Sequence, residues 1–201
     1  VAVNHSSRSH ENQLRQSLIP SLLACRRQNE RHGYANAELF EVARVYLTAG
    51  LGQPEQQAEP LTIGIVSGRP FAQLSGVVEA LAAELAPHAI LTTEPAPHPE
   101  YISGRGATVS LNGKLWGWLG ELSREVLDQS DLQDAVCVAE LRLPLIEELF
   151  EVRRSYTPLP RFPSISRDLN FVLPESISWA QLSETVSKSA GSLLLGTSFG
   201  G

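Results

Sequence analysis

Four arginines gather in a short span of the sequence: Arg153, Arg154, Arg161 and Arg167. The only acidic residues in this span are Glu151 and Asp168. Clustered cations are typical of surfaces that contact nucleic-acid phosphates, but ordinary solvent-facing surfaces have them too. The net charge of the chain is -6, which argues against it holding a nucleic acid unaided. A phosphate-binding role, a solvated surface and an ion pair between Arg167 and Asp168 therefore all stay open.

Residues that usually perform catalysis or bind metals are scattered along the chain. The histidines are His5, His10, His32, His88 and His98. None of them has a Cys, Asp or Glu at the spacing that a metal site requires. No serine lies in a G-x-S-x-G motif, so no Ser-His-Asp set is assigned. Cys25 and Cys137 are isolated, which indicates free thiols in a reducing cytoplasm. We expect no catalytic residue and no metal ligand in this chain.

Glycines mark two further places of interest. The sequence Gly104-Arg105-Gly106 precedes a predicted strand, and no helix N-terminus follows to bind a phosphate, so a turn is predicted. Gly117 and Gly120 flank Trp118 inside a strand, where they indicate close packing of the backbone rather than approach of a ligand.

Apolar spacing predicts the elements that would position these residues. Ser17 is expected to cap a helix that ends at Gly33, followed by a strand over residues 39–47. The apolar stripe of this helix is Leu18, Ile19, Leu22, Leu23 and Cys25. A loop over 50–60 and a strand over 61–67 come next. The spacing of Phe71, Leu74, Val78, Leu81 and Leu85 then predicts a helix that Pro87 stops.

The middle of the chain predicts an antiparallel hairpin. Residues 94–99 form a proline-rich loop, and residues 107–111 and 114–119 are strands joined at Asn112-Gly113, a pair that accepts the positive φ angles of a tight turn. A short helix over 123–129, a strand over 135–141 and a helix over 144–150 follow.

Residues 153–160 are the predicted domain boundary. Beyond it we expect a strand over 167–173, a helix that Ser178 and Gln181 begin with a capping box, and a second strand from residue 193 to 195. The buried face of that helix is predicted to consist of Trp179, Leu182, Val186 and Ala190. This order, strand, helix, strand, is the first half of a ferredoxin-like unit.

Composition agrees with one large or two small soluble domains. The chain has 201 residues, of which 42% are hydrophobic and 19% are charged. No apolar run is long enough to cross a bilayer and no signal peptide is visible, so we expect a cytoplasmic protein without membrane contact. The sequence contains no methionine, which favours a piece of a longer chain over a processed terminus.

Three blocks of sequence carry a resemblance to a known family. The first block is Leu14-Arg15-Gln16-Ser17-Leu18-Ile19-Pro20-Ser21-Leu22-Leu23, with Asn29, Arg31 and Leu39-Phe40-Glu41-Val42 after it. The second is Gly117-Trp118-Leu119-Gly120-Glu121-Leu122, and the third is Pro160-Arg161-Phe162-Pro163-Ser164-Ile165-Ser166-Arg167-Asp168-Leu169. In this order they resemble the beta subunit of phenylalanyl-tRNA synthetase, over nearly the whole chain.

The resemblance implies an α+β fold in two parts. Residues 1–153 would form a partial class II aminoacyl-tRNA synthetase-like antiparallel sheet with flanking helices. Residues 154–201 would form half of a ferredoxin-like, anticodon-binding unit. The implied function is scaffolding within phenylalanine–tRNA ligase, whose holoenzyme uses ATP and magnesium. The implied partners are the alpha subunit, contacted near Phe71, Leu74 and Val78, and tRNA, contacted by the four arginines.

The resemblance also implies that this part of the beta subunit is not catalytic. A class II synthetase site needs one arginine on a core strand for the ATP α-phosphate and a second at the end of a glycine-rich strand, because fixed cations must offset the developing charge. Glu41 and Arg44 lie on the relevant predicted strand, but the second arginine is missing. Two alternatives remain: an active ATP-dependent ligase, and a stand-alone interaction or small-molecule-binding module with a synthetase-like fold.

Overall fold

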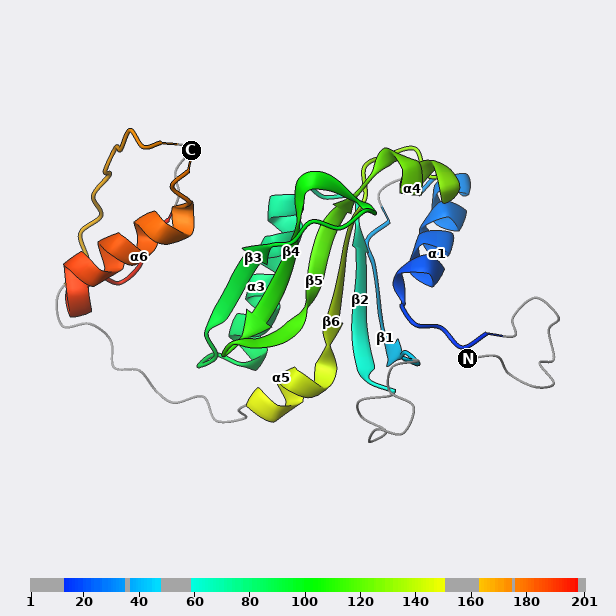
Figure 1. The fold of residues 1–201 in the computed structure, drawn as a ribbon, viewed down its shortest axis with the longest axis horizontal. Coiled ribbons are helices and arrows are strands. Elements are labelled where there is room, and N and C mark those ends of the chain that lie inside the picture. The colour runs from blue at the N-terminus through cyan, green and yellow to red at the C-terminus, as the bar shows by residue number, and fades with distance from the viewer. Residues whose placement is uncertain (1–12, 35–36, 48–58, 151–162, 175, 199–201) are drawn as a thin grey trace. The chain divides into compact units, whose positions relative to one another are not determined.

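The computed structural model describes residues 13–34, 37–47, 59–150, 163–174 and 176–198 of the chain. The chain divides into two compact units, Val1–Arg154 and Ser155–Gly201. Most of the regular secondary structure belongs to the first unit (Figure 1).

A six-stranded antiparallel sheet forms the centre of the first unit. Its strands, in the spatial order β1-β2-β6-β5-β4-β3, are β1 (Leu39–Arg44), β2 (Leu61–Ser67), β6 (Cys137–Arg142), β5 (Lys114–Leu122), β4 (Tyr101–Leu111) and β3 (Leu91–Pro95). The last strand in the sequence, β6, thus lies between the first two strands and the other three. The predicted α+β architecture with an antiparallel sheet is confirmed.

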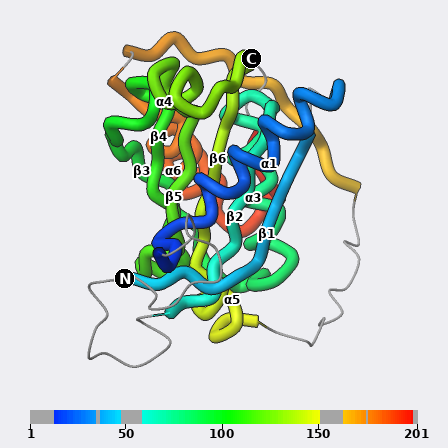
Figure 2. Tube along the Cα trace, turned by 90° about the vertical axis from the view of Figure 1, so that its right-hand side faces the viewer, coloured from blue at the N-terminus to red at the C-terminus, as the bar shows by residue number. Residues whose placement is uncertain are grey.

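Helices cover both faces of this sheet, as the two views in Figures 1 and 2 show. They are α1 (Ile19–Arg31), α3 (Phe71–Leu85), α4 (Arg124–Gln129) and α5 (Leu143–Leu149). One hydrophobic cluster joins α3 and α5 to the sheet around Val78, Trp116 and Ile146. A second cluster joins α1 and α4 to the other face around Leu22, Leu127 and Val138.

Helix α1 begins one residue later than its predicted cap implies. Leu18 is the N-cap, and the Ser17 hydroxyl accepts a hydrogen bond from the N–H of Ile19 at 3.1 Å. The helix ends at Arg31, and Gly33 follows with φ +89°, a conformation that glycine adopts without strain. Leu18, Leu22 and Leu23 are buried as predicted.

One member of the predicted α1 stripe is misplaced. Cys25 is exposed rather than buried. The buried position on the neighbouring side of the helix belongs to Arg26 instead, because its guanidinium finds hydrogen-bond acceptors inside the protein.

The predicted hairpin is confirmed, with longer strands than expected. Asn112 and Gly113 have φ angles of 50° and 77°, as a tight turn between right-twisted strands requires. Strand β4 continues back to Tyr101, so the prediction of a turn at residues 104–106 was wrong. Gly104 adopts φ +78° inside the strand, and the pairing with β5 shifts register between Tyr101 and Gly106. Such a bulge bends the strand without ending it.

The proline-rich loop predicted over 94–99 is partly a strand. Its first two residues end β3, whose register runs from Leu91 opposite Leu111 to Pro95 opposite Ala107. Strand β3 is an edge strand, so one of its sides pairs with no other strand. A proline can lie there because a backbone N–H on that side has no strand partner to bind. The remaining predicted elements of the first unit, α3, α4, α5, β2 and β6, are present within one or two residues of their expected bounds.

The second unit differs from its prediction. Residues 163–174 form neither helix nor strand, so the predicted strand over 167–173 was wrong. Residues 191–193 form a single 3-10 turn, and residues 194 and 195 are not a strand. Alternating apolar residues indicate a strand only where a neighbouring strand can accept the backbone hydrogen bonds. No such neighbour exists among the described residues of this unit, and a half ferredoxin-like fold is not confirmed.

The helix of the second unit, α6 (Trp179–Ala190), is present with its predicted capping box. The N–H of Ser178 donates to the Gln181 side chain at 2.8 Å, and the N–H of Gln181 donates to the Ser178 hydroxyl at 3.3 Å. The predicted buried face is incorrect, however, because no residue of α6 is buried and the Trp179 side chain is 43% exposed. Leu182 and Val186 are half-buried.

We expect the amides of α6 to exchange with solvent much faster than those of β6. Strand β6 is buried along almost its whole length, whereas α6 packs none of its side chains into a core. Segments with few buried contacts open with a small free-energy cost. Hydrogen–deuterium exchange on the monomeric chain tests this. Equal protection of the two elements would show that α6 has a core that the structure does not contain.

Candidate binding cleft on the sheet

An open cleft of about 870 Å³ lies on the face of the sheet that carries α1. Strands β4, β5 and β6 form its floor, and its walls are the first turns of α1, the end of α4 and the segment before β4. This volume is within the usual range for small-molecule sites.

A row of three side chains crosses the floor of the cleft. Thr108 of β4 pairs with Trp118 of β5, which in turn pairs with Glu140 of β6, and all three line the cavity. Residues opposite each other on neighbouring strands point to the same face of a sheet. The row therefore presents a hydroxyl, an indole ring and a carboxylate side by side.

Glu140 is the charged group of this row. The residue is only 4% exposed, and its two carboxylate oxygens accept hydrogen bonds from the Leu18 N–H at 2.8 Å and the Ser17 hydroxyl at 3.0 Å. Burial raises the pKa of the Glu140 carboxyl above its ordinary value, and these two hydrogen bonds offset part of that rise. The carboxylate thereby attaches the start of α1 to the central strand.

Tyr101 forms the aromatic wall of the cleft, and two glycines make room for its ring. A Cβ atom at Gly106 would lie 2.7 Å from the ring, and one at Gly120 would lie 2.5 Å from ring carbon Cε2. The ring of His98 lies against Tyr101, with 4.9 Å between the ring centroids. Burial, and then the nearby charges of Glu100 and Glu140, raise the pKa of the Tyr101 phenol, so it stays protonated.

In the part of the chain that the structure describes, Arg27 of α1 is the one arginine that lines the cleft. It is half-buried. The cleft thus combines one cationic side chain with two carboxylates, those of Glu100 and Glu140.

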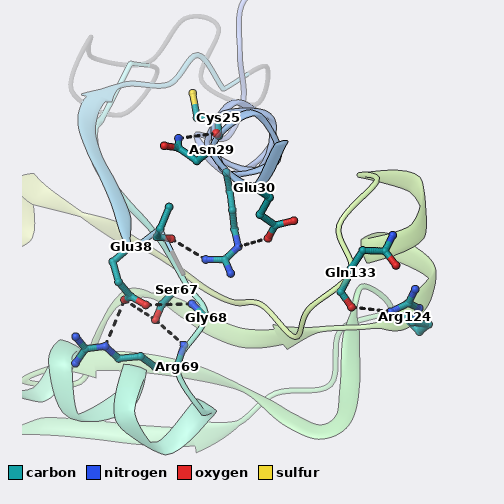
Figure 3. Close-up of polar contacts among 11 residues, drawn as sticks. Cys25, Asn29, Glu30, Glu38, Ser67, Gly68, Arg69, Arg124 and Gln133 are labelled. Atoms are coloured by element: carbon teal, nitrogen blue, oxygen red, sulfur yellow. Dashed lines mark hydrogen bonds and ion pairs between the residues drawn. The ribbon is translucent and has the colours of Figure 1, made fainter. Parts of the chain in front are cut away.

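A polar network links α1 to the segment before β1, and that segment to the end of β2 (Figure 3). Arg26 is 0% exposed and donates to the carbonyl of Ala37 at 2.7 Å and to Glu30 at 3.2 Å. The Glu38 carboxylate accepts from the Ser67 hydroxyl at 2.7 Å. Figure 3 shows Glu38 also reaching toward the backbone after Ser67, where it accepts the N–H of the next residue at 3.2 Å. These contacts make the position of α1 over the sheet specific.

The arginines predicted to contact tRNA are only partly described. Arg153, Arg154 and Arg161 lie outside the described residues. Arg167 is exposed, in a segment without helix or strand. The structure therefore does not bring the four arginines together in its described part, and their role stays a prediction.

The three residues predicted to lie at a subunit interface are the start of α3. Leu74 and Val78 are each 1% exposed and belong to the hydrophobic cluster under α3, while Phe71 is half-buried at its margin. A side chain that is 1% exposed offers almost no surface to a partner. Core packing, which the helical spacing of these residues favours, thus describes Leu74 and Val78.

Glu41 and Arg44, on the strand where the resemblance implies an ATP-binding arginine, do not line the cleft. Glu41 pairs with Arg15 at 2.8 Å, and Arg44 donates to the Glu59 carbonyl at 3.0 Å on the outer edge of the sheet. Neither residue is among those that line the cavity. The described residues also contain no group of three or more His, Cys, Asp or Glu side chains placed to hold a metal ion. None of the described helices has the length and apolarity to span a membrane.

Sequence patterns did not indicate the residues that form the cleft. Tyr101, Trp118 and Glu140 are far apart in the chain, and only strand register brings them together. The available signal was the set of strand glycines. Close packing was predicted for Gly117 and Gly120, and it is confirmed: a Cβ at Gly117 would overlap the backbone of Glu140, and Gly120 accommodates Tyr101.

The stability difference between Glu140→Gln and the wild-type chain is expected to change with pH. A carboxyl with a raised folded pKa binds its proton more tightly when folded, so its ionisation opposes folding. From about pH 4.5 up to the folded pKa, wild-type stability should therefore fall relative to Glu140→Gln, and above that pKa the difference should level off. Urea unfolding of both proteins between pH 4 and about 8 measures it. A difference that is constant over this range would contradict the prediction.

The fold is similar to that of a solved aminoacyl-tRNA synthetase. It superposes on the pyrrolysyl-tRNA synthetase PylSc of Desulfitobacterium hafniense with a TM-score of 0.51 and 18% sequence identity, over 66% of this chain and 47% of that one. At this identity the match shows a shared fold and nothing about activity.

Sequence comparison gives the particular family. Residues 1–143 match the model of the phenylalanyl tRNA synthetase beta chain CLM domain, and the chain belongs to this family. It is 35% identical over 185 residues to the phenylalanine–tRNA ligase beta subunit of Rhodopirellula baltica, and 34% identical over 197 residues to that of Symbiobacterium thermophilum. These alignments cover 88% and 90% of this chain but 27% and 22% of the relatives, so the chain spans about a quarter of their length. The predicted family is confirmed.

Proposed function

We propose that this chain serves as the non-catalytic, synthetase-like scaffold of a phenylalanine–tRNA ligase beta subunit. The observation that carries the proposal is this family match together with a cleft whose described lining residues include no pair of arginines for ATP. Adenylate formation builds negative charge that fixed cations must offset, and the described cleft contains Arg27 beside two carboxylates instead. The holoenzyme, acting in the cytoplasm with ATP and magnesium, would charge tRNA with phenylalanine at a catalytic site outside this chain.

The exposed edge of the sheet supports a contact with the alpha subunit. Phe40 and Val42 alternate along β1, and their side chains are 75% and 46% exposed. Two neighbouring apolar side chains on an edge strand are typical of a surface that another chain covers. Of the three residues in the predicted interface stripe, Phe71 is the one that is only half-buried, so its side chain could take part in such a contact. The exposed Arg167 remains our candidate for positioning tRNA.

The isolated chain is expected to show no phenylalanine-dependent exchange between ATP and pyrophosphate and no charging of tRNA. The missing arginine pair is the reason. The assay uses purified chain, with the complete holoenzyme as the positive control. Exchange that co-elutes with the chain, and that survives removal of contaminating synthetase, would support the alternative of an active ligase.

Co-purification with the alpha subunit of the same organism tests the scaffold role. We expect the wild-type chain to retain the alpha subunit, and Phe40→Asp to retain less, because a charge on β1 opposes burial of that edge. Val172→Asp, which changes a fully exposed apolar side chain of the second unit, is the matched control. Failure of the wild-type chain to retain the alpha subunit would instead favour a stand-alone module.

A further inference from the structure

The cleft has no task in the proposed scaffold function, yet it has the features of a binding site. It is lined by aromatic and apolar side chains with a few polar groups that converge on its floor. Its floor is rigid, because strand pairing places Trp118 directly beside Glu140 and α1 is bonded to Glu140. A pre-formed site of this kind loses little conformational entropy when a ligand enters.

Charge decides which ligand such a cleft accepts. A carboxylate oxygen accepts more than one hydrogen bond, and each oxygen of Glu140 has one partner within the chain. A second carboxylate, that of Glu100, lies close enough to raise the pKa of Tyr101 together with Glu140. A cationic donor would satisfy the remaining acceptor capacity of Glu140, whereas an anion would be repelled.

The shape of the cleft favours a planar group beside that cation. The Trp118 side chain is 36% exposed on the floor, and the Tyr101 ring is held in place over Gly106 and Gly120. Aromatic faces stack on planar rings and also attract cations. We propose that the cleft binds a small molecule that contains both a planar ring and a protonated alkyl amine, with the amine at Glu140 and the ring between Trp118 and Tyr101.

A nucleotide is the main alternative ligand, since the fold is that of ATP-using enzymes. Its phosphates would require several cationic or backbone N–H donors. Among the described residues, Arg27 is the one arginine or lysine that lines the cleft, and Glu100 and Glu140 line it too. The charge balance therefore favours the amine over the nucleotide.

Three probes of similar size separate these possibilities on the complete 201-residue chain. They are 2-phenylethylamine, which is cationic, 2-phenylethanol, which is neutral, and 3-phenylpropanoate, which is anionic. Each is titrated into ¹⁵N-labelled protein at pH 7 while the indole N–H signals of the tryptophans are followed, with ATP in a fourth titration. We expect saturable binding of the amine, shown by the Trp118 signal, at least about tenfold tighter than the alcohol or the acid.

Two variants connect the binding to the cleft. Glu140→Gln keeps the shape of the side chain and is expected to weaken amine binding about tenfold or more. Glu148→Gln is the matched control, because it removes an exposed carboxylate on α5 that pairs with Lys114, and should leave binding unchanged. Trp118→Leu keeps the contacts between Glu140 and α1, and should weaken binding about threefold or more through loss of the ring.

The results overturn the proposal in any of three cases. The first is that no probe binds saturably, and the second is that the alcohol, the acid or ATP binds as tightly as the amine. The third is that Glu140→Gln binds the amine as the wild-type chain does. If Glu140→Gln does not fold, Trp118→Leu decides: unchanged amine affinity in that variant refutes the site. The alpha-subunit assay is independent of these results, so the scaffold role and the cleft can fail separately.

Discussion

Gly117→Ala is expected to destabilise the first unit by about 1–3 kcal/mol. Gly117 lies on β5 opposite Leu141, where the backbones of β5 and β6 approach closely. A Cβ atom at this position would overlap the carbonyl oxygen of Glu140 and lie 2.9 Å from the Cα of Leu141. Both neighbours are backbone atoms of the central strand, so no side chain can rotate away, and the two strands must separate.

The matched control is Gly76→Ala. Gly76 lies in α3, and a Cβ there would meet no atom within 4 Å. An added methyl group at such a site stabilises a helix by about 0.5–1 kcal/mol. Chemical unfolding of both variants should therefore give shifts of opposite sign. Similar shifts for the two glycines would mean that β5 and β6 do not pair as described.

Leu22→Ala is the second variant with a large expected effect. Leu22 is 5% exposed and packs with Leu18 against Gly64, where a Cβ would lie 2.9 Å from a Leu22 methyl group. The glycine lets α1 lie directly on β2, and the truncated side chain would leave a cavity that the helix cannot close. Such truncations cost about 2–5 kcal/mol.

Gln28→Ala on the exposed side of the same helix is the control for Leu22→Ala. It removes a side chain that is exposed and leaves helix propensity nearly unchanged. The denaturation midpoint should fall clearly for Leu22→Ala and hardly for Gln28→Ala. A Leu22→Ala midpoint equal to that of the control would place α1 away from the sheet.

Local signals in the sequence were sufficient where the backbone itself demands particular residues. The turn at Asn112-Gly113 and the capping box at Ser178 were predicted because positive φ angles and free N–H groups select few residue types. Strand β3 was missed because Pro95 indicates a loop unless the strand is known to be an edge. The strand predicted over 167–173 was wrong because an alternation of apolar and polar residues does not indicate whether a partner strand exists.

The cleft could not be predicted from sequence patterns, because its residues come together only through the pairing of distant strands. Glu140 resembles any glutamate in a strand until the register places it beside Trp118 and under the start of α1. Buried polar groups such as Arg26 also contradict the apolar stripe by which a helix is recognised. Residues whose role depends on tertiary partners cannot be identified from spacing alone.

The central position of β6 has a consequence for how this domain is made. Residue 62 pairs with residue 142, and β5 pairs with the same strand from its other side. During synthesis, the pair β1–β2 and the three strands β3, β4 and β5 therefore leave the ribosome before the strand that joins them. Until β6 emerges, β2 and β5 each have an open edge, and such edges bind other unfinished chains. The order of synthesis therefore makes the pairing of β6 with β2 and β5 the last contact that the sheet can form.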